Sequence, residues 1–222
     1  MGYFPHEMPL TLTSDELRYS SLMATLSKPQ RSTREETHAR IMAKADELFR
    51  RYGYGKTTVA DIAEELGMST ANIYKFFPSK SAIVESSADR NVAHVKETVS
   101  KIVRARKSAL HRLEEMVVAI FQFHQELFRH ERQIFKLIVV AMEEEWACID
   151  QYNDFLLQTV CDLVKEGMGS GEFRAANPDD TAQTLLDCLS LALHPHLRHK
   201  WNHDETDERV RQQVRFLGKA LK

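Results

Sequence analysis

The stretch from 57 to 80, TTVADIAEELGMSTANIYKFFPSK, predicts two short helices joined by a tight turn. Thr57-Thr58 followed by Asp61 is a helix-capping pattern, and Ser69 is placed to cap the second helix. Gly67 supplies the small residue that the turn needs. Apolar residues at helical spacing would lock the two helices at a fixed angle: Ile62, Ala63, Leu66 and Ile73. This combination is typical of a helix-turn-helix unit.

The second of these helices carries side chains suited to DNA. It is expected to expose Thr70, Ala71, Asn72 and Lys75. An asparagine can form two hydrogen bonds with adenine, and an alanine can contact the methyl group of thymine. Because such a helix fits the major groove of double-stranded DNA, we expect this segment to bind there.

The rest of the chain predicts an all-α protein. Neither glycine nor proline occurs between Ser79 and Glu166, and apolar stripes at helical spacing recur on both sides of that interval. We expect about nine helices in three regions. These are a flexible N-terminal extension (1–30), a three-helix DNA-binding domain (31–80) and a larger helical domain (81–222).

Composition excludes several classes of protein. Hydrophobic residues make up 43% and charged residues 28% of the 222 residues, which excludes disorder along the whole length. We expect no membrane span and no secretion signal, and we interpret the widely spaced Cys148, Cys161 and Cys188 as reduced core residues of a cytoplasmic protein. The net charge is −2, yet residues 28–56 hold eight basic against four acidic side chains, as expected of an end that meets a polyanion.

The spacing of these motifs resembles the tetracycline-repressor (TetR) family of bacterial regulators. The residues that carry the resemblance are Thr57-Thr58, Ile62-Ala63, Gly67-Met68-Ser69, Ile73-Tyr74, Phe77 and Ser79-Lys80. The stretch 68–72 further resembles multidrug-efflux repressors of the AmeR type. The resemblance implies a cytoplasmic, homodimeric repressor that a small hydrophobic ligand releases from an inverted-repeat operator. Residues 81–222 would then be its effector-binding and dimerisation domain.

The resemblance also implies roles for individual residues. DNA contacts would come from Arg31, Arg34, Thr57, Thr58, Ser69, Thr70, Ala71, Asn72, Tyr74, Lys75 and Lys80. Position 76 is often histidine in the family and is phenylalanine here, which puts a phosphate contact there in doubt. Structural alternatives stay open for several of these positions: Thr58 and Ser69 as helix caps, Tyr74 as a packed ring, and Arg31 and Arg34 as solvated charges.

Two further sets of residues are predicted in the helical domain. Aromatic and methionine side chains are expected in its core, and some of them would form a ligand pocket: Met116, Phe121, His124, Phe128, Met142, Trp146, Tyr152 and Phe155. Two apolar stripes near the end of the chain are expected to form a dimer interface: Leu185, Leu189, Leu193, Val210, Val214 and Leu217.

Two alternative functions come from other features. His194, His196, His199 and His203 would suit a helical metal-dependent enzyme, although Pro195 and the polar run 202–205 favour a helix end instead. A DNA-binding regulator controlled by a protein partner is the second alternative. Since no nucleophile–base pattern or phosphate loop is present, we expect no enzyme activity, cofactor or metal.

Overall fold

The computed structural model describes residues 33–174, 177–194 and 207–222, and their regular structure is entirely helical. The predicted all-α fold class is therefore confirmed. The ten helices of these ranges are α2 (Arg34–Tyr52), α3 (Val59–Glu65), α4 (Thr70–Tyr74), α5 (Lys80–Val103), α6 (Ala109–His130), α7 (Arg132–Glu143), α8 (Ala147–Gly169), α9 (Pro178–Cys188), α10 (Ser190–Leu193) and α12 (Asp207–Ala220). The predicted count of nine differs because the last-but-one helix is divided at Leu189, whose ψ of 4° interrupts the regular turn.

Capping residues set the starts of several helices. Thr33 and Glu36 form a reciprocal capping box at the start of α2, with N···O distances of 2.9 and 3.1 Å. The Ser79 hydroxyl accepts a hydrogen bond from Ala82 N at the start of α5. Asn177 caps α9 directly before Pro178, where the missing amide costs no hydrogen bond. Local side-chain chemistry therefore fixes these boundaries.

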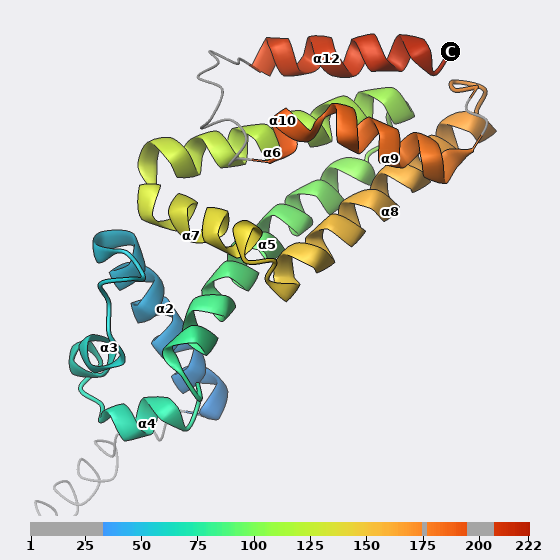
Figure 1. Ribbon diagram of the computed structural model, residues 1–222. Coiled ribbons are helices and arrows are strands. Elements are labelled where there is room, and N and C mark those ends of the chain that lie inside the picture. Colours follow the sequence, from blue (N-terminus) through green and yellow to red (C-terminus); the bar gives the residue numbers. More distant parts are fainter. Residues whose placement is uncertain (1–32, 175–176, 195–206) are drawn as a thin grey trace, which may run out of the picture. The chain divides into compact units, whose positions relative to one another are not determined.

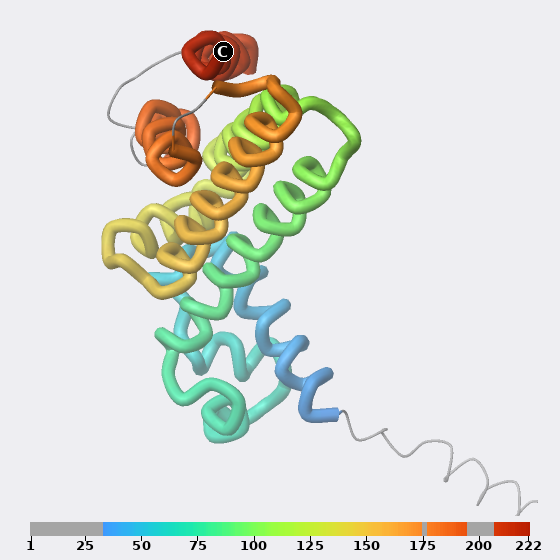
Figure 2. Tube along the Cα trace, turned by 90° about the vertical axis from the view of Figure 1, so that its right-hand side faces the viewer, coloured from blue at the N-terminus to red at the C-terminus, as the bar shows by residue number. Residues whose placement is uncertain are grey.

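The chain divides into two units, residues 1–37 and 38–222, and the packing described below is that of the larger unit. Helices α5, α6 and α8 contact one another and form its centre (Figure 1). Around this centre, α7 packs on α5 and α6, α9 packs on α8, and α12 lies along α6 (Figure 2). Among the described residues, no helix is long and apolar enough to cross a membrane.

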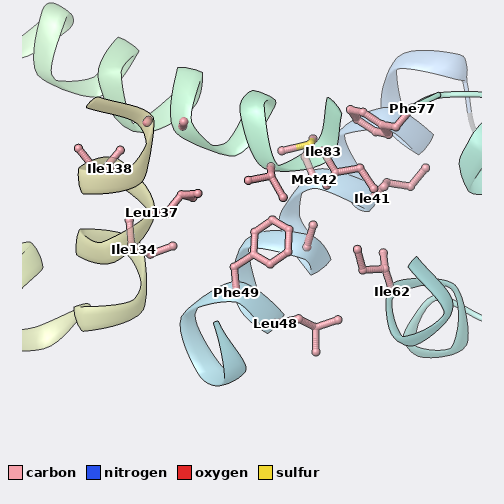
Figure 3. Close-up of a cluster of buried hydrophobic side chains, with 14 of the residues drawn as sticks. Ile41, Met42, Leu48, Phe49, Ile62, Phe77, Ile83, Ile134, Leu137 and Ile138 are labelled. Atoms are coloured by element: carbon pink, nitrogen blue, oxygen red, sulfur yellow. The ribbon is translucent and has the colours of Figure 1, made fainter. Parts of the chain in front are cut away.

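One hydrophobic cluster joins the helix-turn-helix to the helices that follow it. Figure 3 shows Ile41, Met42 and Phe49 of α2 between Ile62 of α3 on one side and α5 and α7 on the other. The α7 members of this cluster are all buried: Ile134, Phe135, Leu137, Ile138 and Ala141. Because core side chains are closely packed, a displacement of α7 or α5 is transmitted to α2.

A second cluster fills the far end of the larger unit, and it corrects the predicted dimer interface. Five of the six predicted residues, Leu185, Leu189, Leu193, Val210 and Val214, are at most 4% exposed within a single chain. They pack against α5, α6 and α8 rather than facing outward. Leu217 alone of the six is partly exposed. An amphipathic stripe shows that a helix is packed, and here the partner is the same chain.

A buried carboxylate holds α12 on α6. Glu114 accepts hydrogen bonds from Arg215 at 2.9 and 3.0 Å and from Arg211 at 3.1 Å. Burial raises the pKa of Glu114, but the hydrogen bonds from both arginines outweigh this effect, so its pKa is lowered overall.

Cys188 of α9 is exposed, which corrects its expected place in the core, whereas Cys148 and Cys161 are buried as predicted.

Gly167 of α8 makes room for the buried ring of Phe173. A Cβ atom on Gly167 would lie 2.1 Å from this ring, whereas one on Gly169 would meet no heavy atom within 4 Å. Glu172, which lies between Gly167 and Phe173 in the sequence, accepts hydrogen bonds from Ala109 N and Leu110 N at the start of α6. The turn after α8 therefore caps α6, and it depends on the missing side chain of Gly167.

We predict that Gly167→Ala lowers the free energy of unfolding by about 1–3 kcal/mol, because a rigid buried ring must move. Gly169→Ala is the matched control. It should leave stability unchanged or raise it by up to about 1 kcal/mol through better helix propensity. Urea denaturation measures both variants, and equal stability of the two would contradict this account of the turn.

We predict that Glu114→Gln lowers the free energy of unfolding at pH 7 by about 1–3 kcal/mol, because two arginines lose an ionised partner. Since the folded-state pKa of Glu114 is lowered, its contribution is complete above the ordinary glutamate value of about 4.3 and is lost as the pH falls through the folded value. The stability gap between wild type and variant should therefore close in acid. A gap that persists unchanged to pH 2 would contradict the clamp.

Candidate nucleic-acid interface

The turn between α3 and α4 is closed by backbone hydrogen bonds around one left-handed glycine. Gly67 has a φ of +62°, a conformation that residues with side chains rarely adopt. Its amide donates to Glu64 O at 3.0 Å, and the Met68 amide donates to Ala63 O at 2.8 Å. This pair of bonds is the Schellman motif, which ends α3 and redirects the chain into α4. The predicted role of Gly67 is confirmed.

Two hydroxyl side chains cap these helices. Thr58 accepts a hydrogen bond from Asp61 N at 3.1 Å, while its own amide donates to Asp61 Oδ2 at 2.7 Å. This amide bond is the main cause of the lowered pKa of Asp61. Ser69 accepts from Asn72 N at 3.2 Å. Because capping uses an oxygen lone pair, each hydroxyl proton is left to donate, and capping is compatible with a phosphate contact.

The exposed side of this unit holds most of the predicted DNA-binding residues. Lys75 and Tyr74 at the end of α4 are exposed, Tyr74 by 50%. Asn72 and Lys80 are half-buried, and Lys80 Nζ donates to Gly55 O at 3.4 Å. Thr58, Ser69, Thr70 and Ala71 are exposed as well. Arg34 is also exposed, but it belongs to the smaller unit, residues 1–37. Arg31 lies outside the described residues.

Thr57 is a correction to the predicted set. Its side chain is 2% exposed, and its hydroxyl donates to Gly53 O at 3.0 Å. The hydroxyl therefore stabilises the turn after α2 and is out of reach of a phosphate. Phe76, where the family often has histidine, is partly buried against the cluster that contains Ile62 and Ile73. That position contributes packing rather than a polar contact.

An ion pair between a buried carboxylate and an exposed guanidinium fixes α2 against α5. Asp46, whose side chain is 8% exposed, accepts a hydrogen bond from Ser87 Oγ at 2.6 Å and pairs with Arg90 Nη1 at 2.9 Å. Sequence reasoning missed Asp46. The available signal was its register, because it lies four residues after Met42 and three before Phe49, on the buried face of α2.

A second contact connects the end of α2 with the corner between α6 and α7. Arg50 Nε donates to Glu131 Oε2 at 2.7 Å. Next to it, a Cβ atom on Gly53, where φ is +85°, would lie 2.9 Å from Gln133 Oε1. The helix-turn-helix is thus held by both α5 and α7, two helices that belong to the predicted effector domain.

Three of the eight predicted pocket residues line one cavity between α5, α6, α7 and α8. They are His124, Met142 and Tyr152. The other lining residues, which the sequence analysis did not place in the pocket, are Asn91, Val92, Val95, Phe123, Ile138 and Ile149. The pocket was predicted from aromatic and methionine residues. The α5 side of the cavity has none of these, because it is formed by Asn91, Val92 and Val95.

The other five predicted pocket residues lie elsewhere. Met116 and Phe121 are fully buried in the second cluster. Trp146 lines a separate surface groove with Glu85, Asp89, Ala147, Cys148 and Gln151. Phe155 has the Lys96 ammonium over its ring at 5.2 Å. Phe128 is 37% exposed, beneath the Arg132 guanidinium at 5.3 Å.

Comparison with known proteins matches both halves of the chain to one family. Residues 41–86 match the family model described as bacterial regulatory proteins, tetR family. Residues 109–214 match the model of the tetracyclin repressor-like C-terminal domain. The chain belongs to the TetR family. It is thus a DNA-binding transcriptional regulator, and α3 and α4 form its helix-turn-helix.

Individual TetR-family proteins resemble it at low identity. The HTH-type transcriptional regulator YfiR of Bacillus subtilis is 24% identical over 165 residues, which cover 68% of this chain and 75% of YfiR. The nucleoid occlusion factor SlmA of Aliivibrio fischeri is 31% identical over 101 residues, so the match spans about half of SlmA (49%) and 46% of this chain. A crystal structure of a TetR/AcrR-family regulator from Thermobifida fusca superposes with a TM-score of 0.61 at 23% identity, covering 84% of this chain and 98% of that one.

The TetR-family assignment bears on the enzyme alternative. The described residues contain no group of three or more side chains that could hold a metal ion. His194 follows α10, whereas His196, His199 and His203 lie outside the described residues. The family match thus points to a regulator.

Proposed function

We propose that this TetR-family regulator is a homodimeric repressor that binds an inverted-repeat operator and leaves it when a small hydrophobic molecule enters its helical domain. Residues 31–80 would bind DNA, and residues 81–222 would bind the effector and dimerise. The observation that carries the proposal is the exposed face of α4, which presents Thr70, Ala71 and Lys75. The opposite side of the helix-turn-helix is buried in the first hydrophobic cluster. Residues of this kind and spacing match the base edges and phosphates of a major groove.

Release by a ligand is supported by where the cavity lies. Helices α5 and α7 line it, and the same two helices hold α2 through Asp46 and through the first hydrophobic cluster. A molecule that displaces them therefore acts on the DNA-binding unit without touching it. Control of drug efflux, as in the AmeR-type repressors that residues 68–72 resemble, is the narrower form of this proposal. A transporter gene next to this one, and changed drug tolerance on overexpression, would support that narrower form.

Dimerisation is expected on the outward faces of α9 and α12. A surface groove there is lined by Cys188, Glu208, Arg209, Gln212, Gln213, Phe216 and Leu217. Phe216 is 73% exposed, whereas the apolar stripe on the other side of α12 is buried. A single short recognition helix contacts few base pairs, so a second copy is needed for tight and specific binding.

We predict that Asn72→Ala and Lys75→Ala weaken DNA binding in different ways. The operator is first selected from randomised DNA, where an inverted repeat is expected. Lys75→Ala should weaken binding to every sequence and lower the salt slope by about one, because it removes a phosphate contact. Asn72→Ala should instead relax the preference at one base position, at a cost of about 1–3 kcal/mol.

The matched control for these variants is Lys101→Ala, which removes an exposed lysine from the last turn of α5. It should leave operator affinity and salt slope unchanged. Fluorescence anisotropy at several salt concentrations measures all three variants. Selection of no sequence at all from the randomised pool would refute sequence-specific DNA binding.

We predict that Phe216→Glu converts the dimer into a monomer and weakens operator binding at least tenfold, because a charge would be buried at the centre of the interface. Ala93→Glu, which adds the same charge at an exposed position of α5, is the control and should stay dimeric. Light scattering measures the mass of both. A Phe216→Glu protein that remains dimeric would place the interface elsewhere.

A further inference from the structure

The cavity between α5, α6, α7 and α8 is lined without a carboxylate, an ammonium or a guanidinium. Six of its nine lining residues are aliphatic, phenylalanine or methionine, and the other three are Asn91, His124 and Tyr152. The carboxylates of Glu85 and Asp89 line the separate groove beside Trp146 instead. A cationic ligand would lose its hydration in this cavity without gaining a counter-charge.

The hydroxyl of Tyr152 is a buried polar group of this cavity. Tyr152 is 3% exposed, and its hydroxyl has no hydrogen-bond partner among the described residues. Burial raises the pKa of Tyr152, so the phenol stays neutral and keeps its proton. A buried donor of this kind is stabilised by an acceptor, such as a carbonyl oxygen, brought by a ligand.

The cavity is nearly closed in this structure. Its volume is about 20 Å³, which is room for one water molecule. Pockets that hold small organic ligands measure roughly 300–1,000 Å³. A ligand therefore enters only as the surrounding helices move apart.

We propose that the effector is a neutral, mainly apolar molecule with one hydrogen-bond acceptor, which accepts from the Tyr152 hydroxyl and binds by parting α5 and α7 from α6 and α8. This inference rests on the proposed function, since it names the ligand class of that same site. Asn91 lines the cavity on the α5 side, so a ligand that widens the cavity would displace it. Its side-chain amide donates to Ser87 O at 2.8 Å. Ser87 in turn donates to Asp46 of α2, so the wall of the cavity is one helical turn from the clamp on the DNA-binding unit.

A matched series of four naphthyl compounds tests the ligand class on the full-length protein. These probes are 2-acetonaphthone (neutral, with a carbonyl), 2-ethylnaphthalene (same shape, no acceptor), 2-naphthoate (anion) and 2-naphthyltrimethylammonium (cation). Calorimetric titration should show 2-acetonaphthone binding roughly 2- to 12-fold more tightly than 2-ethylnaphthalene, the range expected of one neutral hydrogen bond. Both charged probes should bind more weakly than either.

Tyr152→Phe locates the hydrogen bond. The variant removes one oxygen without a partner among the described residues, so it should fold as stably as wild type. It should erase the preference for 2-acetonaphthone and leave 2-ethylnaphthalene binding unchanged. Tyr52→Phe, which removes an exposed hydroxyl at the end of α2, is the matched control and should keep the preference.

The outcomes separate this inference from the proposed function. Tighter binding of either charged probe, absence of binding by all four, or an unchanged preference in Tyr152→Phe would each overturn the ligand class. Operator DNA gives an independent measurement, since saturating 2-acetonaphthone should weaken operator binding roughly 5- to 150-fold. A probe that binds through Tyr152 but leaves operator affinity unchanged would support the ligand class and count against release by ligand.

Discussion

The buried carboxylate of Asp46 is the interaction on which the position of the DNA-binding unit depends. An ionised group taken out of water is costly, and here Ser87 and Arg90 of α5 offset that cost with hydrogen bonds of 2.6 and 2.9 Å. Both partners lie within one turn of the same helix. Because these charge-assisted bonds are short and directional, α2 cannot slide or tilt along α5 without losing them.

Apolar packing extends the effect of this clamp. The first hydrophobic cluster contains side chains from α2, α3 and α4 and continues without a break into α5 and α7. At its edge, Arg50 and Glu131 tie the end of α2 to the corner that begins α7. In the part of the chain that the structure describes, the helix-turn-helix shares its core with α5 and α7, so its position follows theirs. These are also the helices that line the cavity, so in the proposed function an expansion of the cavity would move α4.

The sequence predicted best what local chemistry determines. The capping residues Thr58 and Ser69 and the glycine at 67 were all found from spacing, because each acts within three or four residues of itself. Thr57 shows the limit of this reasoning, since two adjacent threonines look alike in sequence. One is an exposed cap, and the other is buried and bonded to the previous turn.

Features that depend on distant partners were predicted less well. The apolar stripes of residues 185–193 and 210–217 were predicted to form a dimer interface, whereas most of their side chains pack within a single chain. Periodicity does not tell whether a helix packs on its own chain or on a second copy. In α6, the cavity is lined by Phe123 and His124, whereas the predicted Phe121 and Phe128 point into the core and toward solvent. Positions one or two residues apart on a helix face different directions, so a cavity-lining residue and a core residue can be close neighbours in sequence. Which positions line the cavity depends on how all four helices pack together.

Energy magnitudes indicate how a ligand with a single hydrogen bond could switch this protein. To move a two-state equilibrium from 1:99 to 99:1, a ligand must favour one state by about 5.5 kcal/mol. A neutral hydrogen bond to Tyr152 supplies only about 0.5–1.5 kcal/mol of this. Burial of about 200 Å² of apolar surface supplies about 5 kcal/mol, provided that this surface fits only the expanded state. The nearly closed cavity meets that condition, since it excludes such a ligand until α5 and α7 have moved. Apolar bulk therefore drives the conformational change, and the lone hydroxyl decides which apolar molecules are accepted.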